Sequence, residues 1–209
     1  MIPTQGQMRY LPRMADAPKS TPAMTVEEFM DLNPGGDELW QLVDGEPRAM
    51  VQSSVAHGML LAEVSSVIGN HLYAAGSSRY PELLVGVVPH VNARHNIRVP
   101  DLSIAHGASD EEERWLDAPV LVVELLTPEN HAETWENIWA CTSIPSVEEM
   151  LVLHVKQVGA DLLRRDADGR WPRDLERLTG GDLVLHSVGL RIPLADLYRT
   201  IRLHSSARL

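Results

Sequence analysis

Several features that are common in proteins are scarce in this sequence of 209 residues. It has a single cysteine, Cys141, so an intramolecular disulfide is excluded. No apolar run approaches the roughly 20 residues that a membrane-spanning helix needs. The first residues include basic side chains but lack the apolar stretch of a secretory signal. We therefore expect a cytoplasmic protein with no membrane segment.

The motifs of several familiar chemistries are also missing. The sequence has no glycine-rich phosphate loop, no nucleophile elbow and no dinucleotide-binding fingerprint, and its histidines do not follow zinc-ligand spacing. Only two lysines occur, Lys19 and Lys156. The net charge of −11 argues against a protein that coats nucleic acid through many phosphate contacts. A local basic groove would still allow DNA binding.

The composition predicts one globular domain. The chain is 44% hydrophobic and 22% charged, which suits a folded protein with a core. Residues 1–23 contain four prolines and little apolar periodicity, so we expect a flexible N-terminal arm there. The remaining expectation is a single domain over residues 24–203 and a short tail at 204–209.

Local patterns predict a short helix and then a hairpin near the start of this domain. Residues 25–28 form a capping box, which begins a helix that Pro34-Gly35-Gly36 should end. The Asp44-Gly45 pair lies between two strand-like runs at 39–43 and 46–51. An Asp-Gly pair in this position is a strong hairpin signal.

A mixed sheet covered by helices is predicted for the rest of the chain. Ser54 is the expected N-cap of a long helix that ends near Gly76 and buries a stripe formed by Leu60, Val64, Val67, Ile68 and Leu72. The other expected elements are strands at 83–91, 97–105, 120–126 and 149–155, a helix at 129–141, a second hairpin around 166–169 and a short helix from Pro193 to Tyr198. This order indicates an α/β or α+β fold.

Two acidic residues carry the clearest chemical signal. Asp101 follows Pro100 on one predicted strand, and Glu124 interrupts the apolar run of the next. A carboxylate in a buried strand is costly to ionise unless a cation or hydrogen bonds compensate it. Two such acids on adjacent strands would make an oxygen-rich site of the kind that Mg²⁺ or Mn²⁺ prefers. The alternative is that Glu124 lies at a strand end near solvent.

His57 is the third candidate, because it falls in the first turn of the long predicted helix. A helix N-terminus disfavours the charged imidazolium, so a neutral ring could donate to or accept from a phosphate there. A surface or capping histidine is the alternative.

In their order, these segments resemble the Uma-type (Uma-two) family of restriction-endonuclease-like proteins, a branch of the PD-(D/E)xK nuclease superfamily. The resemblance runs from about Met24 to Leu203. It rests on MTVEEF at 24–29, LVDGE at 42–46, AH at 56–57, GNHL at 69–72, VPDL at 99–102, LVVELLTP at 121–128, SIPSVEE at 143–149, GRW at 169–171 and PLADLY at 193–198.

The resemblance implies a restriction-endonuclease-like fold, a mixed sheet flanked by helices after an N-terminal β-hairpin. It makes Asp101 and Glu124 the acids that bind Mg²⁺ or Mn²⁺, with the carbonyl of Leu125 as a further ligand. It also implies that His57 belongs to the site and that the substrate is DNA.

Three departures from the family or superfamily pattern matter. Gln41 stands where the family usually has an acid before its hairpin turn. Leu126 occupies a position that is lysine in many members of the superfamily. The family's Asp-x-x-x-Lys-x-x-x-Tyr helix pattern is replaced here by Glu133, Asn137 and Cys141.

Three functions remain open from the sequence. The first is a metal-dependent DNA endonuclease in which His57, Gln41 and Asn137 assist Asp101 and Glu124. The second is a catalytically silent nuclease fold that binds nucleic acid or a partner. The third is an oligomeric scaffold whose acidic surface meets other proteins, and a homodimer is one form it could take. Calorimetric titration with Mn²⁺ would separate the first from the others.

Overall fold

The computed structural model describes residues 23–32, 38–51, 54–106, 113–201 and 203. Almost all of the expected N-terminal arm, the Pro34-Gly35-Gly36 helix stop and the expected C-terminal tail lie outside these residues. No helix among the described residues is long and apolar enough to cross a membrane.

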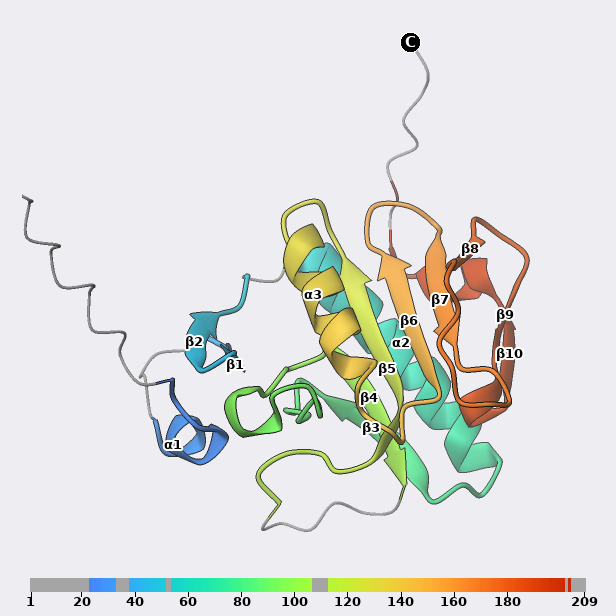
Figure 1. The fold of residues 1–209 in the computed structure, drawn as a ribbon. Coiled ribbons are helices and arrows are strands. Elements are labelled where there is room, and N and C mark those ends of the chain that lie inside the picture. Colours follow the sequence, from blue (N-terminus) through green and yellow to red (C-terminus); the bar gives the residue numbers. More distant parts are fainter. Residues whose placement is uncertain (1–22, 33–37, 52–53, 107–112, 202, 204–209) are drawn as a thin grey trace, which may run out of the picture.

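A six-stranded mixed sheet forms the centre of the molecule (Figure 1). Its strands follow the order β3 (Arg79–Leu83), β4 (Leu102–His106), β5 (Pro119–Leu126), β6 (Glu149–His154), β7 (Ala160–Arg164) and β8 (Glu176–Leu178). Only β5 and β6 are parallel. The parallel pair needs a crossover, which α3 (His131–Cys141) supplies. The apolar run of β5 suits this position, because both of its faces are covered.

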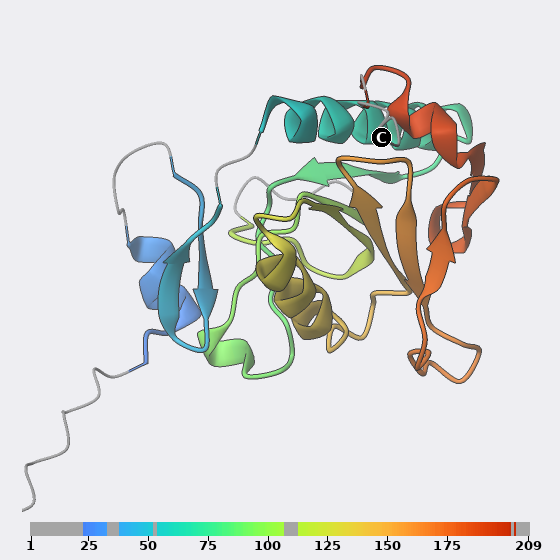
Figure 2. The same ribbon diagram turned by 90° about the horizontal axis from the view of Figure 1, so that it is seen from above.

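One helix covers each face of this sheet, as the view from above shows (Figure 2). The helix α2 (Val55–Ala74) packs on one face through the predicted stripe, of which Leu60, Val64, Ile68 and Leu72 are buried and Val67 is partly buried. On the other face, Ile138 and Cys141 of α3 pack against Val122, Met150 and Val152. Ser54 caps α2, as expected, by accepting from the backbone N–H of His57 at 3.2 Å. The mixed sheet between helices confirms the predicted fold class.

A small N-terminal unit lies beside the sheet. It contains α1 (Val26–Asp31), which begins with the predicted capping box, and the hairpin of β1 (Trp40–Val43) and β2 (Glu46–Ala49). Asp44 and Gly45 have φ angles of 50° and 83°, as a two-residue type I′ turn requires. The hairpin joins the rest of the domain through reciprocal backbone hydrogen bonds of 3.0 Å between Leu42 and Ile97.

The prediction of a strand at 83–91 is wrong. The strand β3 comes earlier, at Arg79–Leu83, and β4 begins at Leu102, five residues later than predicted. Between them the chain is irregular and contains a 3₁₀ turn at Ala93–His95 and isolated bridges from Val87. The apolar residues of this segment do not extend the sheet. Val88 joins the cluster of Leu42 and Ile97 at the hairpin, whereas Val85 and Val87 join the cluster between the sheet and α3, and periodicity alone cannot reveal that.

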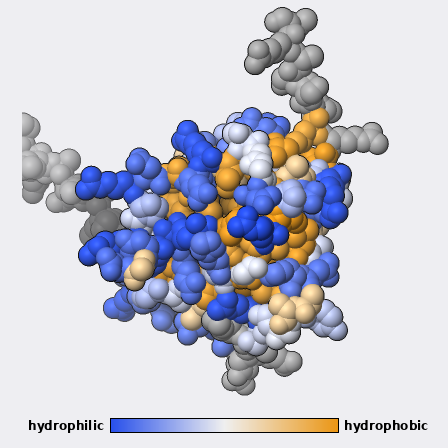
Figure 3. All heavy atoms as spheres, turned by 90° about the vertical axis from the view of Figure 1, so that its right-hand side faces the viewer, coloured by the Kyte–Doolittle hydropathy of each residue, from blue (hydrophilic) through white to orange (hydrophobic). Residues whose placement is uncertain are grey.

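The C-terminal region contains a hairpin that the sequence analysis missed, formed by β9 (Asp182–Leu185) and β10 (Leu190–Pro193). The predicted pairing around residues 166–169 is confirmed, because β7 and β8 are antiparallel. The predicted final helix is a 3₁₀ helix, Leu194–Tyr198. On this side of the molecule, hydrophobic residues show between hydrophilic ones (Figure 3).

Glu149 fastens this C-terminal hairpin to the sheet. Its buried carboxylate accepts hydrogen bonds from the backbone N–H and hydroxyl of Ser187, in the turn between β9 and β10, and from Arg164. Burial raises the pKa of Glu149, but the hydrogen bonds from Ser187 and Arg164 outweigh it, so the pKa lies below its usual value. A depressed carboxyl pKa stabilises the fold above the unfolded value of about 4.3, and this stability is lost as pH falls.

We expect Glu149→Gln to lower the free energy of unfolding at pH 7 by about 2 kcal/mol, because hydrogen bonds to a buried charge are worth about 1.5–3 kcal/mol. It should also reduce the loss of stability on acidification. Urea unfolding at several pH values would measure both effects. The exposed neighbour Glu148 provides the matched control, Glu148→Gln, which should leave both quantities unchanged. Equal behaviour of the two variants would contradict this role for Glu149.

Candidate active site

Asp101 and Glu124 lie side by side on adjacent strands. Leu102 of β4 pairs with Val123 of β5, so the register continued by one residue places Asp101 opposite Glu124. The Oδ2 atom of Asp101 accepts a 2.7 Å hydrogen bond from the backbone N–H of Leu125. Only 5% of Asp101 and 4% of Glu124 are exposed. Two carboxylates therefore meet at the same end of two central strands, almost out of contact with water.

Burial, together with the neighbouring Asp101, raises the pKa of Glu124 well above its usual value. Burial contributes most, because it disfavours the charged form, and the negative charge of Asp101 comes next. A hydrogen bond from Asn137 opposes the shift, and the charge of Glu133 adds to it. The pair is therefore unfavourable when both members are ionised with no cation between them.

His57 reaches the pair from the N-terminus of α2. Its Nε2 atom lies 3.1 Å from Oδ1 of Asp101, and its ring is buried. A carboxylate only accepts hydrogen bonds, so this contact places a proton on Nε2. The other ring nitrogen, Nδ1, is buried without a hydrogen-bond partner in the described part of the chain.

Two buried amides complete the set of predicted residues. The Nδ2 group of Asn137 donates to Oε1 of Glu124 at 3.4 Å, and Nε2 of Gln41 donates to Oε1 of Glu133 at 3.0 Å. Gln41 thus reaches the site only through Glu133. Among the described residues, the oxygens of both amides lack a hydrogen-bond partner. Unpaired buried acceptors are uncommon in proteins and are expected to receive a donor such as water or a ligand.

The carbonyl of Leu125 is already in contact with a polar side chain. Asn130 donates from Nδ2 to this carbonyl at 3.0 Å, while its Oδ1 accepts from the backbone N–H of Thr127 at 2.7 Å. Asn130 therefore fixes the chain where β5 turns into α3. A carbonyl oxygen has two lone pairs, so the bond from Asn130 leaves one of them free.

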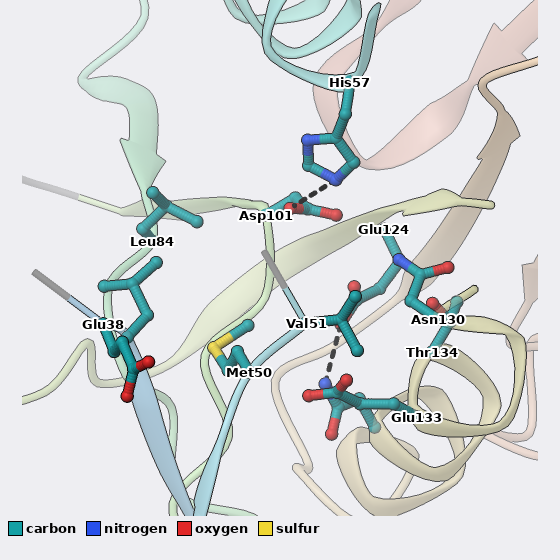
Figure 4. A pocket seen from close by; sticks show the side chains of 12 residues that line it. Glu38, Met50, Val51, His57, Leu84, Asp101, Glu124, Asn130, Glu133 and Thr134 are labelled. Carbon is teal, nitrogen blue, oxygen red and sulfur yellow. Dashed lines mark hydrogen bonds and ion pairs between the residues drawn. The ribbon is translucent and has the colours of Figure 1, made fainter. Parts of the chain in front are cut away.

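All of the predicted site residues except Gln41 and Leu125 line a cavity of roughly 400 Å³ between the hairpin, the sheet and α3 (Figure 4). In that view Leu84 and Glu38 lie on one side, Asn130 and Thr134 on the other, and Asp101 and Glu124 between them. The lining residues are Glu38, Leu39, Met50, Val51, His57, Leu84, Asp101, Glu124, Asn130, Glu133, Thr134 and Asn137. Four of these twelve are acids and none is lysine or arginine, so the cavity attracts cations.

Within the described residues, no lysine is placed to neutralise these acids. Lys156 is exposed and its Nζ lies 3.1 Å from Oε1 of Glu129. Lys19 lies outside the described residues. Within the described part of the chain, no three His, Cys, Asp or Glu side chains form a cluster that could hold a metal ion.

The sequence analysis missed several lining residues. It treated Glu133 only as a departure from the family pattern, yet this residue is half-buried beside the pair, and burial together with neighbouring acids raises its pKa. Asn130 fell inside the helix predicted at 129–141, whereas the structure makes it the residue before α3. The apolar lining residues Leu39, Val51 and Leu84 had no signal in the sequence, since only the packing of the hairpin against the sheet brings them together.

The fold is shared with a nuclease-like protein of known structure. The crystal structure described as "a putative nuclease belonging to DUF820" from Anabaena variabilis ATCC 29413 superposes with a TM-score of 0.68 and 18% sequence identity. The match covers 84% of this chain and 97% of that one. The chain thus has the mixed-sheet fold of that protein.

Sequence comparison identifies the family to which the chain belongs. Residues 26–195 match the Uma2 family, described as "Putative restriction endonuclease", and the chain belongs to this family. One relative, "Uncharacterized protein slr1290" of Synechocystis sp. (strain PCC 6803), is 26% identical over 184 residues, which are 85% of this chain and 93% of that protein. The resemblance inferred from the sequence motifs is confirmed.

The repulsion between Asp101 and Glu124 can be tested through the pH dependence of the protein's stability. When folding raises the pKa of a carboxyl group, the folded protein loses stability as pH rises from the group's unfolded pKa of about 4.3 to its folded pKa. We expect Asp101→Asn to lower the pKa of Glu124 and to shrink the decrease in Tm between about pH 5 and pH 8. Calorimetric melting in metal-free buffer would measure this difference.

Asp161→Asn is the matched control. Asp161 is also a buried strand aspartate, but His154 Nε2 and Arg177 Nε lie 3.0 and 3.3 Å from its carboxylate oxygens, so its charge is paired. Asp161→Asn should lower Tm, because it removes these ion pairs. The decrease in Tm that the ionisation of Glu124 causes should stay as it is in the wild type. An unaltered pH dependence in Asp101→Asn would mean that the two acids are not coupled.

Proposed function

We propose that the protein is a divalent-metal-dependent DNA endonuclease that hydrolyses phosphodiester bonds. Asp101 and Glu124 would hold Mg²⁺ or Mn²⁺. The observation that carries this proposal is the buried, like-charged pair on adjacent strands, which no lysine or arginine of the cavity lining neutralises. Membership of a family of restriction endonucleases supports the reaction class.

The donor atoms fit a hard cation. Asp101 and Glu124 offer carboxylate oxygens, and the carbonyl of Leu125 keeps one lone pair. Mg²⁺ is usually bound by one or two carboxylates, with waters and substrate phosphates completing its shell, so a cluster of three acidic side chains is not required. When bound, such an ion polarises the phosphodiester and lowers the pKa of a water molecule.

The other predicted residues would orient groups around the reacting phosphate. His57 holds Asp101 through Nε2 and presents Nδ1 as a free acceptor. Asn137 holds Glu124 and keeps its own amide oxygen free, which suits a water molecule. Gln41 acts at a distance, because it contacts Glu133 and not the pair itself.

One observation favours a second candidate, a nuclease fold that binds nucleic acid without cleaving it. Asn137 stands at the helix position where the family pattern has lysine, and Lys156 is engaged with Glu129. An amide can position water but supplies no positive charge to the developing phosphorane. Mn²⁺ binding without hydrolysis would distinguish this candidate from the first.

The proposal predicts that nicking of a supercoiled plasmid requires Mn²⁺ or Mg²⁺ and ceases when the metal is chelated. Asp101→Asn should reduce the nicking rate by more than about 100-fold, because even residues outside the ligand shell change metal affinity about 10- to 100-fold. Gel electrophoresis measures nicking, and calorimetry should find Mn²⁺ binding lost in the same variant. Unchanged nicking by Asp101→Asn would remove the activity from this site.

A lysine at position 137, as in the family pattern, should raise the rate of plasmid nicking. Asn137 lines the cavity and contacts Glu124, so the ammonium group in Asn137→Lys would lie close to the pair and could stabilise the transition state. We expect faster nicking at saturating Mn²⁺ than in the wild type.

A lysine elsewhere on the same helix controls for net charge. Trp139 is half-exposed on α3 and does not line the cavity, so Trp139→Lys should leave the rate unchanged. Equal acceleration in both variants would show a general charge effect. If neither the wild type nor Asn137→Lys nicks DNA although Mn²⁺ binds, the silent fold is the better description.

A further inference from the structure

Leu84 is held in a backbone conformation that leucine rarely adopts. Its φ angle is +55°, in the left-handed region, which costs a residue with a Cβ atom about 1–2 kcal/mol. It follows the last residue of β3, and its backbone N–H donates to the carbonyl of Asp101 at 3.3 Å. Leu84, Asp101 and Glu124 thus form one row across three neighbouring strands. Core packing does not explain the strain, because 36% of Leu84 is exposed.

Leu84 belongs to an apolar rim around the acidic cavity. Leu39 and Val51 also line this cavity and are 43% and 48% exposed. They flank the two strands of the N-terminal hairpin, whose ends are held together by a 2.9 Å hydrogen bond from Met50 N–H to the carbonyl of Leu39. Three exposed apolar side chains from three segments therefore surround the entrance to a cavity that contains four carboxylates.

The depth of the acids limits which phosphates can reach them. Asp101 and Glu124 are at most 5% exposed and lie within a cavity of roughly 400 Å³. A double helix is stiff and keeps its bases stacked inside, so its bases are not available to the apolar side chains that line this cavity. A nucleotide whose base is unpaired can turn away from its neighbours, and enzymes read such nucleotides through apolar contacts with the base.

The charged side chains of the cavity also bear on which form of nucleic acid it accepts. Its described lining contains no lysine or arginine, so side chains in the cavity cannot supply the phosphate neutralisation that contributes to the binding of both double- and single-stranded nucleic acid. Besides the proposed metal ion, contacts between the rim and a base remain as a source of affinity, and a base can make them only when it is not stacked in a helix.

We propose that this site takes an unpaired nucleotide, in single-stranded DNA or at a distorted position of a duplex, and that Leu39, Val51 and Leu84 hold its base and sugar. This inference rests on the proposed function, since it places the scissile phosphate at Asp101 and Glu124. The strained leucine is then a specificity residue, which positions an apolar surface beside the reacting group.

Leu84→Gly removes both the backbone strain and the side-chain contact, and the melting temperature and the oligonucleotide affinity report on them separately. Glycine adopts a positive φ without penalty, so this variant should melt at the same temperature as the wild type or higher. It should nevertheless bind a fluorescein-labelled single-stranded oligonucleotide about 10-fold more weakly in Mn²⁺, because a buried leucine contact is lost. Fluorescence anisotropy measures this affinity.

The neighbouring leucine provides the matched control. Leu83 is 44% exposed but does not line the cavity, so Leu83→Ala should keep the wild-type affinity while Leu84→Ala should lose it. The same oligonucleotide folded as a blunt hairpin duplex is the reference substrate. We expect the wild type to bind and cut the single strand at least about 10-fold better than the duplex, and Leu84→Gly to lose most of this preference.

The outcomes separate the two proposals. If duplex and single strand are bound and cut equally, and Leu84→Gly changes neither, the inference is overturned while the nuclease assignment stands. If the single strand is preferred in binding but nothing is cut, the nuclease assignment fails and the inference stands as a binding preference. If neither form is bound or cut, both are overturned.

Discussion

The repulsion between Asp101 and Glu124 is the constraint on which the site depends. The antiparallel register of β4 and β5 brings the two carboxylates together, and the backbone N–H of Leu125 fixes one of them in place. Both acids are buried, with at most 5% of either residue exposed. Such a pair is tolerated in a stable protein when the folded state protonates one member or accepts a cation. The raised pKa of Glu124 and the oxygen-rich surroundings follow from this single arrangement.

The N-terminal hairpin gives the site its second wall, and polar contacts fasten it to α3. Gln41 of β1 donates to Glu133, and Arg48 of β2 lies 3.2 Å from a carboxylate oxygen of Glu136. Arg98 is buried beneath the hairpin and lies 3.8 Å from the same side chain of Glu136. Burial lowers the pKa of Arg98, and the charge of Glu136 opposes the shift. The arginines near the cavity are thus used to hold its walls together, which explains how a cavity lined by four acids keeps its shape.

The sequence predicted elements whose signals are local. The capping box at Thr25, the cap at Ser54 and the Asp44-Gly45 turn each act within a few residues, so each was found. The strand predicted at 83–91 failed for the opposite reason, because its valines are divided between the cluster at the hairpin and the cluster between the sheet and α3, both of which are formed by distant segments. The β9–β10 hairpin was missed although Gly189 marks a turn at its end, since its strands are only four residues each.

The sequence alone identified the candidate residues for the proposed chemistry. It supplied an aspartate after a proline, a glutamate inside an apolar run and no lysine near either, and the order of its motifs determined the family. Only the tertiary structure decided what surrounds those acids. Within the described part of the chain, long-range packing leaves the oxygens of Gln41 and Asn137 without a hydrogen-bond partner, places Glu133 beside the pair and brings Leu39, Val51 and Leu84 to the cavity lining. These relations join segments that are distant in the chain, and a side chain's partner across such a distance depends on the whole fold and not on local propensity.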